Sequence, residues 1–163
     1  MKKVAVLLLL GVFFNICQAE LAGIRHWVLQ QDLETAYEAI HKSLEENKLF
    51  VVFEPNIGKN LAAFAERWGE DYNRNNLQGI RSMVFCSGWY ANQVSNADPQ
   101  LLALCPLHIT LYRHNDMTHV VFVSPTHVGK GSDATVLLQQ LEARGGRAAV
   151  TTVSTIVKNT AHR

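Results

Sequence analysis

The sequence has few cysteines, little excess charge and no long hydrophobic run, and each scarcity excludes a class of protein. It contains 3 cysteines in 163 residues, too few for a small domain held together mainly by disulfides. Its 15 basic and 14 acidic side chains leave a formal net charge of +1, so nucleic acid is not an expected partner. No apolar run reaches the roughly 18 residues that a membrane-spanning helix needs.

The apolar residues are nevertheless numerous enough to build a folded core. Hydrophobic residues make up 48% of the chain and charged residues 18%, a balance typical of globular proteins rather than of disordered chains. A chain of 163 residues corresponds in length to one domain. We therefore expect a single folded unit.

The N-terminal residues have the three-part pattern of a secretory signal peptide. Lys2 and Lys3 precede a short apolar stretch, residues 4–14, and small residues precede a cleavage position after Ala19. We expect removal of residues 1–19, export to the periplasm and no stable membrane anchor afterwards. The mature chain would keep Cys86 and Cys105 in a compartment where disulfides persist.

Hydrophobic patterns after residue 20 predict a mixture of strands and helices. Strands are expected over residues 21–29, 49–53, 80–86, 107–113 and 117–123. The continuous apolar run 49–53 is interpreted as a buried strand. One helix is expected after a capping Asp32 and a second from near Asn60 to Tyr72, with further helices at Pro99 and after Ser132.

A β-hairpin around Asn115 and Asp116 is the clearest local signal. If these two residues form a tight turn, strand alternation places two sets of side chains on opposite faces of the hairpin. The set expected in the core comprises Leu107, Ile109, Leu111, Val120 and Phe122. The set on the other face comprises His108, Thr110, Tyr112, His119 and Val121.

The glycine pair Gly145-Gly146 is interpreted as the end of the last helix. Residues after it change to Thr, Val, Ser and Ala without a persistent period. We therefore expect one domain over residues 20–144 and a loosely held C-terminal tail over residues 145–163.

Three stretches, residues 82–93, Asp98-Pro99 and residues 104–112, resemble the bacterial and archaeal domain of unknown function 302 family. The resemblance implies a strand, a short helical insert, an Asp-Pro turn and a hairpin introduced by a proline. It also implies an α+β domain in which an antiparallel sheet has helices packed on one face. The family brings no established activity, and this chain has Ser87-Gly88 where members often have Asn-Pro.

Chain topology decides whether Cys86 and Cys105 can meet. Cys86 ends one expected strand and Cys105 immediately precedes the next. Antiparallel strands would bring the two cysteines to one end of the sheet, whereas parallel strands would separate them by about 20 Å. Three interpretations stay open: a structural disulfide, two buried free thiols, and a reactive or metal-binding pair.

A ligand site is expected where aromatic, thiol and imidazole groups converge, at Trp89, Tyr90, Cys105 and His108. Cys105 and His108 have a Cys-x-x-His spacing, but residues three apart in a strand face opposite sides unless Pro106 bends the chain. His119 would lie about 13 Å along the hairpin from His108. The sequence therefore assigns no metal and identifies no cofactor.

Three classes of function are compatible with these features. The leading hypothesis is an exported, non-enzymatic protein that binds an unidentified small ligand or serves as an accessory protein. The alternatives are a thiol-dependent redox or metal-binding protein using Cys86 and Cys105, and a homodimeric structural or interaction module. No catalytic residues are assigned, because no nucleophile elbow, paired acids or His-Cys arrangement has local support in the sequence. A Cys-His pair assembled from distant segments stays open.

Overall fold

A computed structural model describes residues 21–160, with side chains described up to residue 149. The predicted signal peptide, residues 1–19, lies outside the described residues. Among residues 21–160, no helix combines the length and the hydropathy needed to cross a bilayer.

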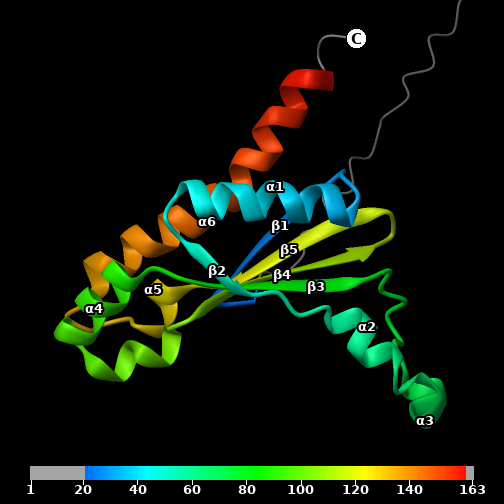
Figure 1. Ribbon diagram of the computed structural model, residues 1–163, viewed down its shortest axis with the longest axis horizontal. Coiled ribbons are helices and arrows are strands. Elements are labelled where there is room, and N and C mark those ends of the chain that lie inside the picture. Colours follow the sequence, from blue (N-terminus) through cyan, green and yellow to red (C-terminus); the bar gives the residue numbers. More distant parts are fainter. Residues whose placement is uncertain (1–20, 161–163) are drawn as a thin grey trace, which may run out of the picture.

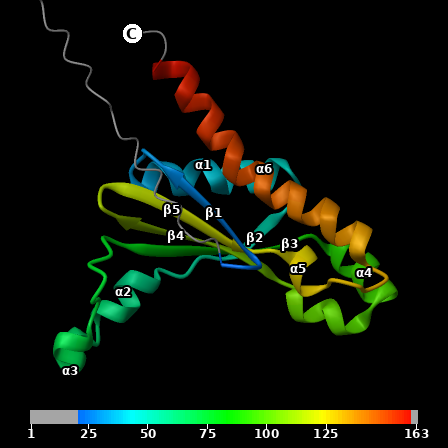
Figure 2. The same ribbon diagram turned by 180° about the vertical axis from the view of Figure 1, so that it is seen from behind.

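A five-stranded antiparallel sheet forms the centre of the molecule (Figure 1). Its strands are β1 (Ile24–Leu29), β2 (Phe50–Phe53), β3 (Ile80–Cys86), β4 (Leu107–His114) and β5 (Met117–Val123). They lie in the order β1-β5-β4-β3-β2, and each neighbouring pair is antiparallel. Helices α1 (Leu33–Glu46) and α6 (Thr135–Thr160) cover the same face of this sheet (Figures 1 and 2). The α+β fold class is confirmed.

The hairpin β4–β5 has the predicted register. Ile109 pairs with Phe122 and Tyr112 with His119, so the two faces carry the expected side chains. Asn115 and Asp116 have φ angles of 48° and 61°, the left-handed conformation that a tight two-residue hairpin turn requires.

The core lies between the sheet and the two helices. Phe85, Ile109 and Phe122 from the sheet are almost completely buried, as are Ile40 and Leu44 from α1. Helix α1 begins as predicted, because the Asp32 carboxylate accepts a hydrogen bond from the Thr35 amide at 3.0 Å. Its apolar stripe accounts for most of its buried side chains.

Helix α6 does not end at Gly145-Gly146, contrary to expectation, but continues to Thr160. The two glycines are placed where the helix passes over the sheet. A β-carbon added at Gly145 would lie 3.3 Å from the Phe122 ring, and one at Gly146 would lie 3.7 Å from Trp27. Ala148 and Ala149, one turn further on, are fully buried. The glycines thus permit a close helix–sheet approach instead of terminating the helix.

Alanine substitutions at these two glycines are expected to have different effects. Gly146→Ala should stabilise the fold by about 1 kcal/mol, because alanine is the better helix former and the new methyl group meets Trp27 at an ordinary distance. Gly145→Ala should lose this gain, because its methyl group presses on the buried Phe122 ring. Urea unfolding midpoints would measure both, and equal stabilisation of the two variants would contradict this account.

Two further expectations about secondary structure are wrong. Strand β2 is not buried, because it is an edge strand whose Phe50, Val52 and Phe53 are exposed. The helix expected from Asn60 to Tyr72 is broken into α2 (Ile57–Ala62), α3 (Ala65–Trp68) and the 3₁₀ helix η1 (Gly69–Asp71). The described residues of α2 and α3 include no buried side chain, so no core contact holds them in one continuous helix.

The connections between β3 and β4 and between β5 and α6 contain the remaining elements. Residues after β3 form α4 (Gly88–Ala97), which the periodicity analysis did not predict although the family resemblance implied a helical insert there. The 3₁₀ helix η2 (Pro99–Leu104) follows it at the predicted place, and α5 (Pro125–Val128) follows β5.

Candidate functional site

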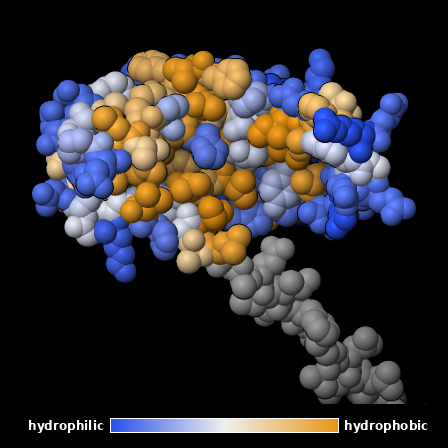
Figure 3. Space-filling model, turned by 90° about the horizontal axis from the view of Figure 1, so that it is seen from below, coloured by the Kyte–Doolittle hydropathy of each residue, from blue (hydrophilic) through white to orange (hydrophobic). Residues whose placement is uncertain are grey.

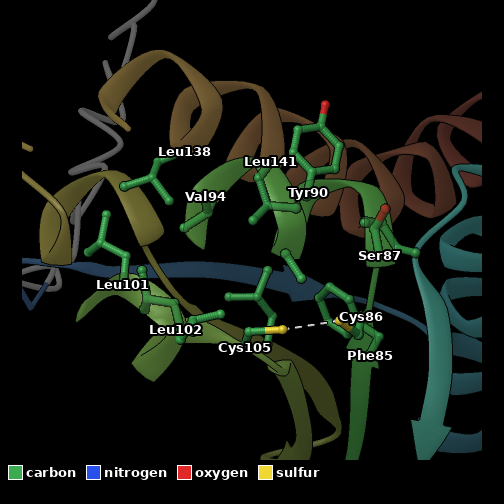
Figure 4. Close-up of a pocket in the computed structure, with 14 residues that line it drawn as sticks. Phe85, Cys86, Ser87, Tyr90, Val94, Leu101, Leu102, Cys105, Leu138 and Leu141 are labelled. Carbon is green, nitrogen blue, oxygen red and sulfur yellow. Dashed lines mark hydrogen bonds between the residues drawn. The ribbon is translucent and has the colours of Figure 1, made fainter. Parts of the chain in front are cut away.

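An apolar pocket lies at the end of the sheet where β3 finishes and β4 begins, bounded by α4, η2 and α6 (Figure 4). The space inside it that water-sized molecules can occupy is about 30 Å³, far below the roughly 300–1,000 Å³ usual for small-molecule sites, so a ligand has to be small or slender. Most of its lining is aliphatic or aromatic, and the polar groups are Ser87, the Tyr90 hydroxyl and the two cysteine thiols.

The pocket forms where two hydrophobic clusters meet. Tyr90 and Val94, one turn apart on α4, point toward the interior and are buried. Asp98 caps η2 by accepting a hydrogen bond from the Gln100 amide at 3.1 Å, and this turn directs Leu101 inward. Val94 and Leu101 pack with Leu138 of α6 in a small cluster beside the main core. The pocket is the space left between them.

Cys86 and Cys105 meet at one side of the pocket. Their Sγ atoms lie 3.1 Å apart, because β3 and β4 are antiparallel and bring both residues to the same end of the sheet. The predicted proximity is thus confirmed for the antiparallel case. Burial, together with the hydrogen bond with Cys86, raises the pKa of the Cys105 thiol to about 11. Little thiolate is therefore present at neutral pH.

The structure brings together only part of the predicted ligand site. Tyr90 and Cys105 line the pocket, and Figure 4 shows the Tyr90 hydroxyl on the side away from the sulfurs. Trp89 is 58% exposed and packs edge-on against Tyr90, with 4.8 Å between ring centroids. His108 is exposed and pairs with Val84 on the face opposite the buried Leu107. Trp89 and His108 are therefore not lining residues.

Sequence patterns did not predict the aliphatic walls of the pocket, which are Val94, Leu101, Leu138 and Leu141. The first belongs to α4, where it is flanked by polar residues, and the second to η2, whose continuous apolar run 101–104 does not show which side chain faces inward. Tyr90 and Val94 are four residues apart, which is the spacing of one helical face. That pair was the available signal for an inward-facing helix.

Comparison with known proteins places the sequence in a family. The family model for the domain of unknown function DUF302 matches residues 26–150. The chain belongs to the DUF302 family. The match begins in β1 and extends past Gly145-Gly146, so the DUF302 domain includes part of the segment that was expected to lie outside it.

Solved structures support the same DUF302 fold. A crystal structure described as an uncharacterized conserved protein DUF302 from Bacillus stearothermophilus matches with a TM-score of 0.67 and 15% sequence identity. The match covers 78% of this chain and 95% of that one. At this identity the likeness shows the fold alone. No curated protein matches the sequence.

The pocket of this DUF302 domain is not arranged as a metal centre. Among the described residues, no group of three or more His, Cys, Asp or Glu side chains is placed to hold a metal ion. Cys105 faces the pocket, whereas His108 lies on the opposite side of the sheet, so the Cys-x-x-His spacing does not converge on one point. The pocket offers mainly apolar contacts, with the two thiols at one side and the Tyr90 hydroxyl at the other.

Proposed function

We propose that this DUF302 protein is an exported, non-enzymatic binding protein that holds a slender apolar ligand in the pocket between α4, η2 and α6. The observation that carries the proposal is the pocket itself, whose walls are apolar and converge from three helices and the end of the sheet. Export is proposed from the pattern of residues 1–19.

The pocket lining favours a neutral ligand with one polar end. Among the described lining residues none carries a formal charge, so a buried ionic group would lack a counter-charge. The hydroxyl of Ser87 and the thiols of Cys86 and Cys105 are the polar groups near one another. A short aliphatic alcohol, with its chain along the leucines and its hydroxyl near Ser87, has the required chemistry.

The thiol-dependent alternative is less well supported. A thiol nucleophile or a thiolate metal ligand has to lose its proton, and burial raises the pKa of Cys105 to about 11. The short sulfur–sulfur distance is equally compatible with a structural disulfide. The reduction potential of the pair, considered in the Discussion, separates these two roles.

Binding of n-alkanols from butanol to octanol tests the proposal by isothermal titration calorimetry. Affinity should rise about fourfold for each added methylene, because burying one CH₂ group contributes about 0.8 kcal/mol. The rise should stop when the chain fills the pocket. An affinity that does not depend on chain length would argue against an apolar pocket as the binding site.

A pair of phenylalanine variants on α4 localises the binding. Ala91→Phe should abolish alkanol binding by filling the pocket that Ala91 lines. The matched variant Asn96→Phe adds a similar bulk to the same helix at an exposed position outside the lining, and it should bind as the wild type does. If Ala91→Phe bound alkanols normally, the ligand would have to lie elsewhere and the proposal would fail.

A further inference from the structure

The sheet face turned away from α1 and α6 has an unusual composition for a surface open to water. Strand alternation and register place His26, Val28, Thr110, Tyr112, His119 and Val121 on it. In the five described strands, the formally charged side chains are Arg25, Arg81 and Arg113, and none of these lies on this face. Figure 3, which looks onto this side, shows apolar surface across the middle of the molecule.

All three strand arginines are engaged on the helix-covered side. Arg25 forms an ion pair with Glu142 of α6 at 2.6 Å, and Arg81 pairs with Glu34 of α1. Arg113 donates a hydrogen bond to the Gln31 carbonyl at 3.1 Å, just before α1. Antiparallel sheets with one solvated face normally carry polar residues there. A face without formal charge and rich in aromatic side chains resembles the core of a protein interface.

Contacts among the rings hold the centre of this face in one arrangement. His26 Nε2 and His119 Nδ1 are 2.9 Å apart. The His119 ring stacks on Tyr112 with 4.8 Å between centroids and 3° between planes. His119 is only 9% exposed. Side chains already fixed in this way lose little conformational entropy when a partner packs on them.

The partner has to be uncharged where it meets this face. Nucleic acids and anionic membranes are recognised through clusters of Lys and Arg, which the described strands do not present on this side. A second copy of the same face is neutral and supplies aromatic and aliphatic groups of the same kind. Two sheets of equal twist pack face to face, and symmetric dimers are the commonest assemblies of identical chains.

The sheet face alone supplies about three-fifths of the area of a standard dimer interface. Five strands at about 4.8 Å spacing and about six residues at about 3.4 Å each give a flat area of roughly 500 Å². A standard interface needs roughly 800 Å² from each partner. Helices α2 and α3 lie on this side of the sheet in both ribbon views (Figures 1 and 2). This segment adds the partly exposed rings of Phe64 and Trp68, which stack at 5.1 Å. Its charged side chains, Lys59, Glu66 and Arg67, are exposed as well, so it extends the contact area as a mixed rim around the uncharged sheet face.

Pairing of two β2 edges is a less suitable arrangement. Strand β2 is at the edge of the sheet and its Phe50 and Phe53 are exposed, but the Val51 amide already donates to Glu45 Oε1 at 2.7 Å. A side chain that occupies an edge amide blocks strand addition. The sheet face is therefore a more suitable surface than the β2 edge.

We propose that the sheet face carrying His26, Thr110, Tyr112 and Val121 is the interface of a symmetric dimer, in which a second copy of this chain packs sheet against sheet. The dimer does not depend on the pocket, which lies beyond the end of β3. Ala91→Phe should accordingly remain dimeric whether or not the pocket binds alkanols.

Sedimentation velocity over roughly 1–100 µM protein tests the interface, because a dimer whose dissociation constant is about micromolar or lower is populated across this range. The molecular mass obtained for the wild type should be twice that of the monomer. Val121→Lys should weaken the dimer by roughly 100-fold or more, because symmetry places two unpaired ammonium groups in the contact. The matched variant Val136→Lys carries the same change at an exposed position on α6 and should dimerise normally.

A second face variant keeps the test decisive if Val121→Lys does not fold. Val28 is 44% exposed on the edge strand β1, so Val28→Lys should retain the wild-type circular dichroism spectrum and also be monomeric. A monomeric wild type at 100 µM, or a dimer that survives a folded lysine variant of this face, would overturn the proposal. A monomeric wild type would indicate that this face binds a different protein instead of a second copy.

Discussion

Under oxidising conditions the protein is expected to melt about 10 °C higher than the same protein with Cys86 and Cys105 reduced. The two Sγ atoms are 3.1 Å apart, so a bond between them requires only a small movement. The cysteines are 19 positions apart, and closing a loop of this size stabilises a fold by about 3 kcal/mol in the chain-entropy model. For a domain of this length each kcal/mol corresponds to roughly 2–4 °C.

Thermal unfolding followed by circular dichroism, with and without a phosphine reductant, measures this difference. The double variant Cys86→Ser, Cys105→Ser is the control, and its melting temperature should not respond to the reductant. If oxidised and reduced wild type melted alike, the two half-buried cysteines would not form a stabilising bond and the structural disulfide would be excluded.

The reduction potential of the same pair distinguishes a structural bond from a redox-active one. A potential below about −300 mV resists the cellular thiol pool and indicates a structural disulfide. A potential near that of disulfide isomerases, about −180 mV, would instead support the thiol-dependent alternative. We expect the lower value, because the raised pKa of Cys105 means that the reduced pair has no stabilised thiolate, which is the feature that makes redox-active pairs strong oxidants.

Local patterns predicted the elements whose structure depends on local contacts. The hairpin β4–β5 was predictable because Asn115 and Asp116 favour a tight turn and the flanking residues alternate. Helix α1 was predictable because Asp32 caps it and its stripe has helical spacing. In both cases neighbouring residues in the sequence determine the conformation.

Features determined by distant contacts were not predictable in the same way. Gly145 resembles a helix stop, but its lack of a side chain admits the Phe122 ring of β5. The apolar run of β2 does not reveal that the strand is at an edge, because its neighbours are set by chain topology. A glycine can end a helix or permit close packing, and an apolar run can form a buried or an edge strand. Which of these occurs depends on the residues that pack against it in the folded chain.

The residues of the candidate site also differ in whether local sequence patterns could predict their positions. Cys86 and Cys105 were recognised as a pair because their strand positions gave a geometric condition, which the antiparallel β3–β4 pairing meets. His108 was grouped with Cys105 from sequence proximity, yet strand alternation places it on the opposite face from Leu107. The walls from α6 lie more than thirty residues away in sequence, beyond the reach of local patterns.

Replacing Glu142 with glutamine is expected to destabilise the fold by about 2 kcal/mol at pH 7. The Glu142 carboxylate joins α6 to the end of the sheet. It accepts hydrogen bonds from Ser124 Oγ at 2.6 Å and from the Thr126 amide at 3.0 Å, and it forms an ion pair with Arg25 at 2.6 Å. The glutamine variant keeps the size of the side chain but loses the charge that strengthens these bonds.

The pKa of Glu142 gives the pH range of this effect. Burial raises the pKa, but the hydrogen bonds from Ser124 and Thr126 and the contact with Arg25 outweigh it and lower the pKa from 4.5 to about 2. Such a difference corresponds to about 3 kcal/mol, which we reduce to about 2 because Arg25 is 52% exposed and screened by water. The contribution is complete above pH 4.5 and is lost as the pH falls toward 2.

Urea unfolding of wild type and Glu142→Gln between pH 2 and pH 7 tests this linkage. The two stabilities should differ most at pH 7 and converge near pH 2, where the wild-type carboxylate gains its proton. Glu38→Gln, at an exposed position on α1, is the control and should follow the wild type throughout. A Glu142→Gln deficit of the same size at every pH would show that shape, not charge, makes the contribution, because a neutral side chain has no proton to gain in this range.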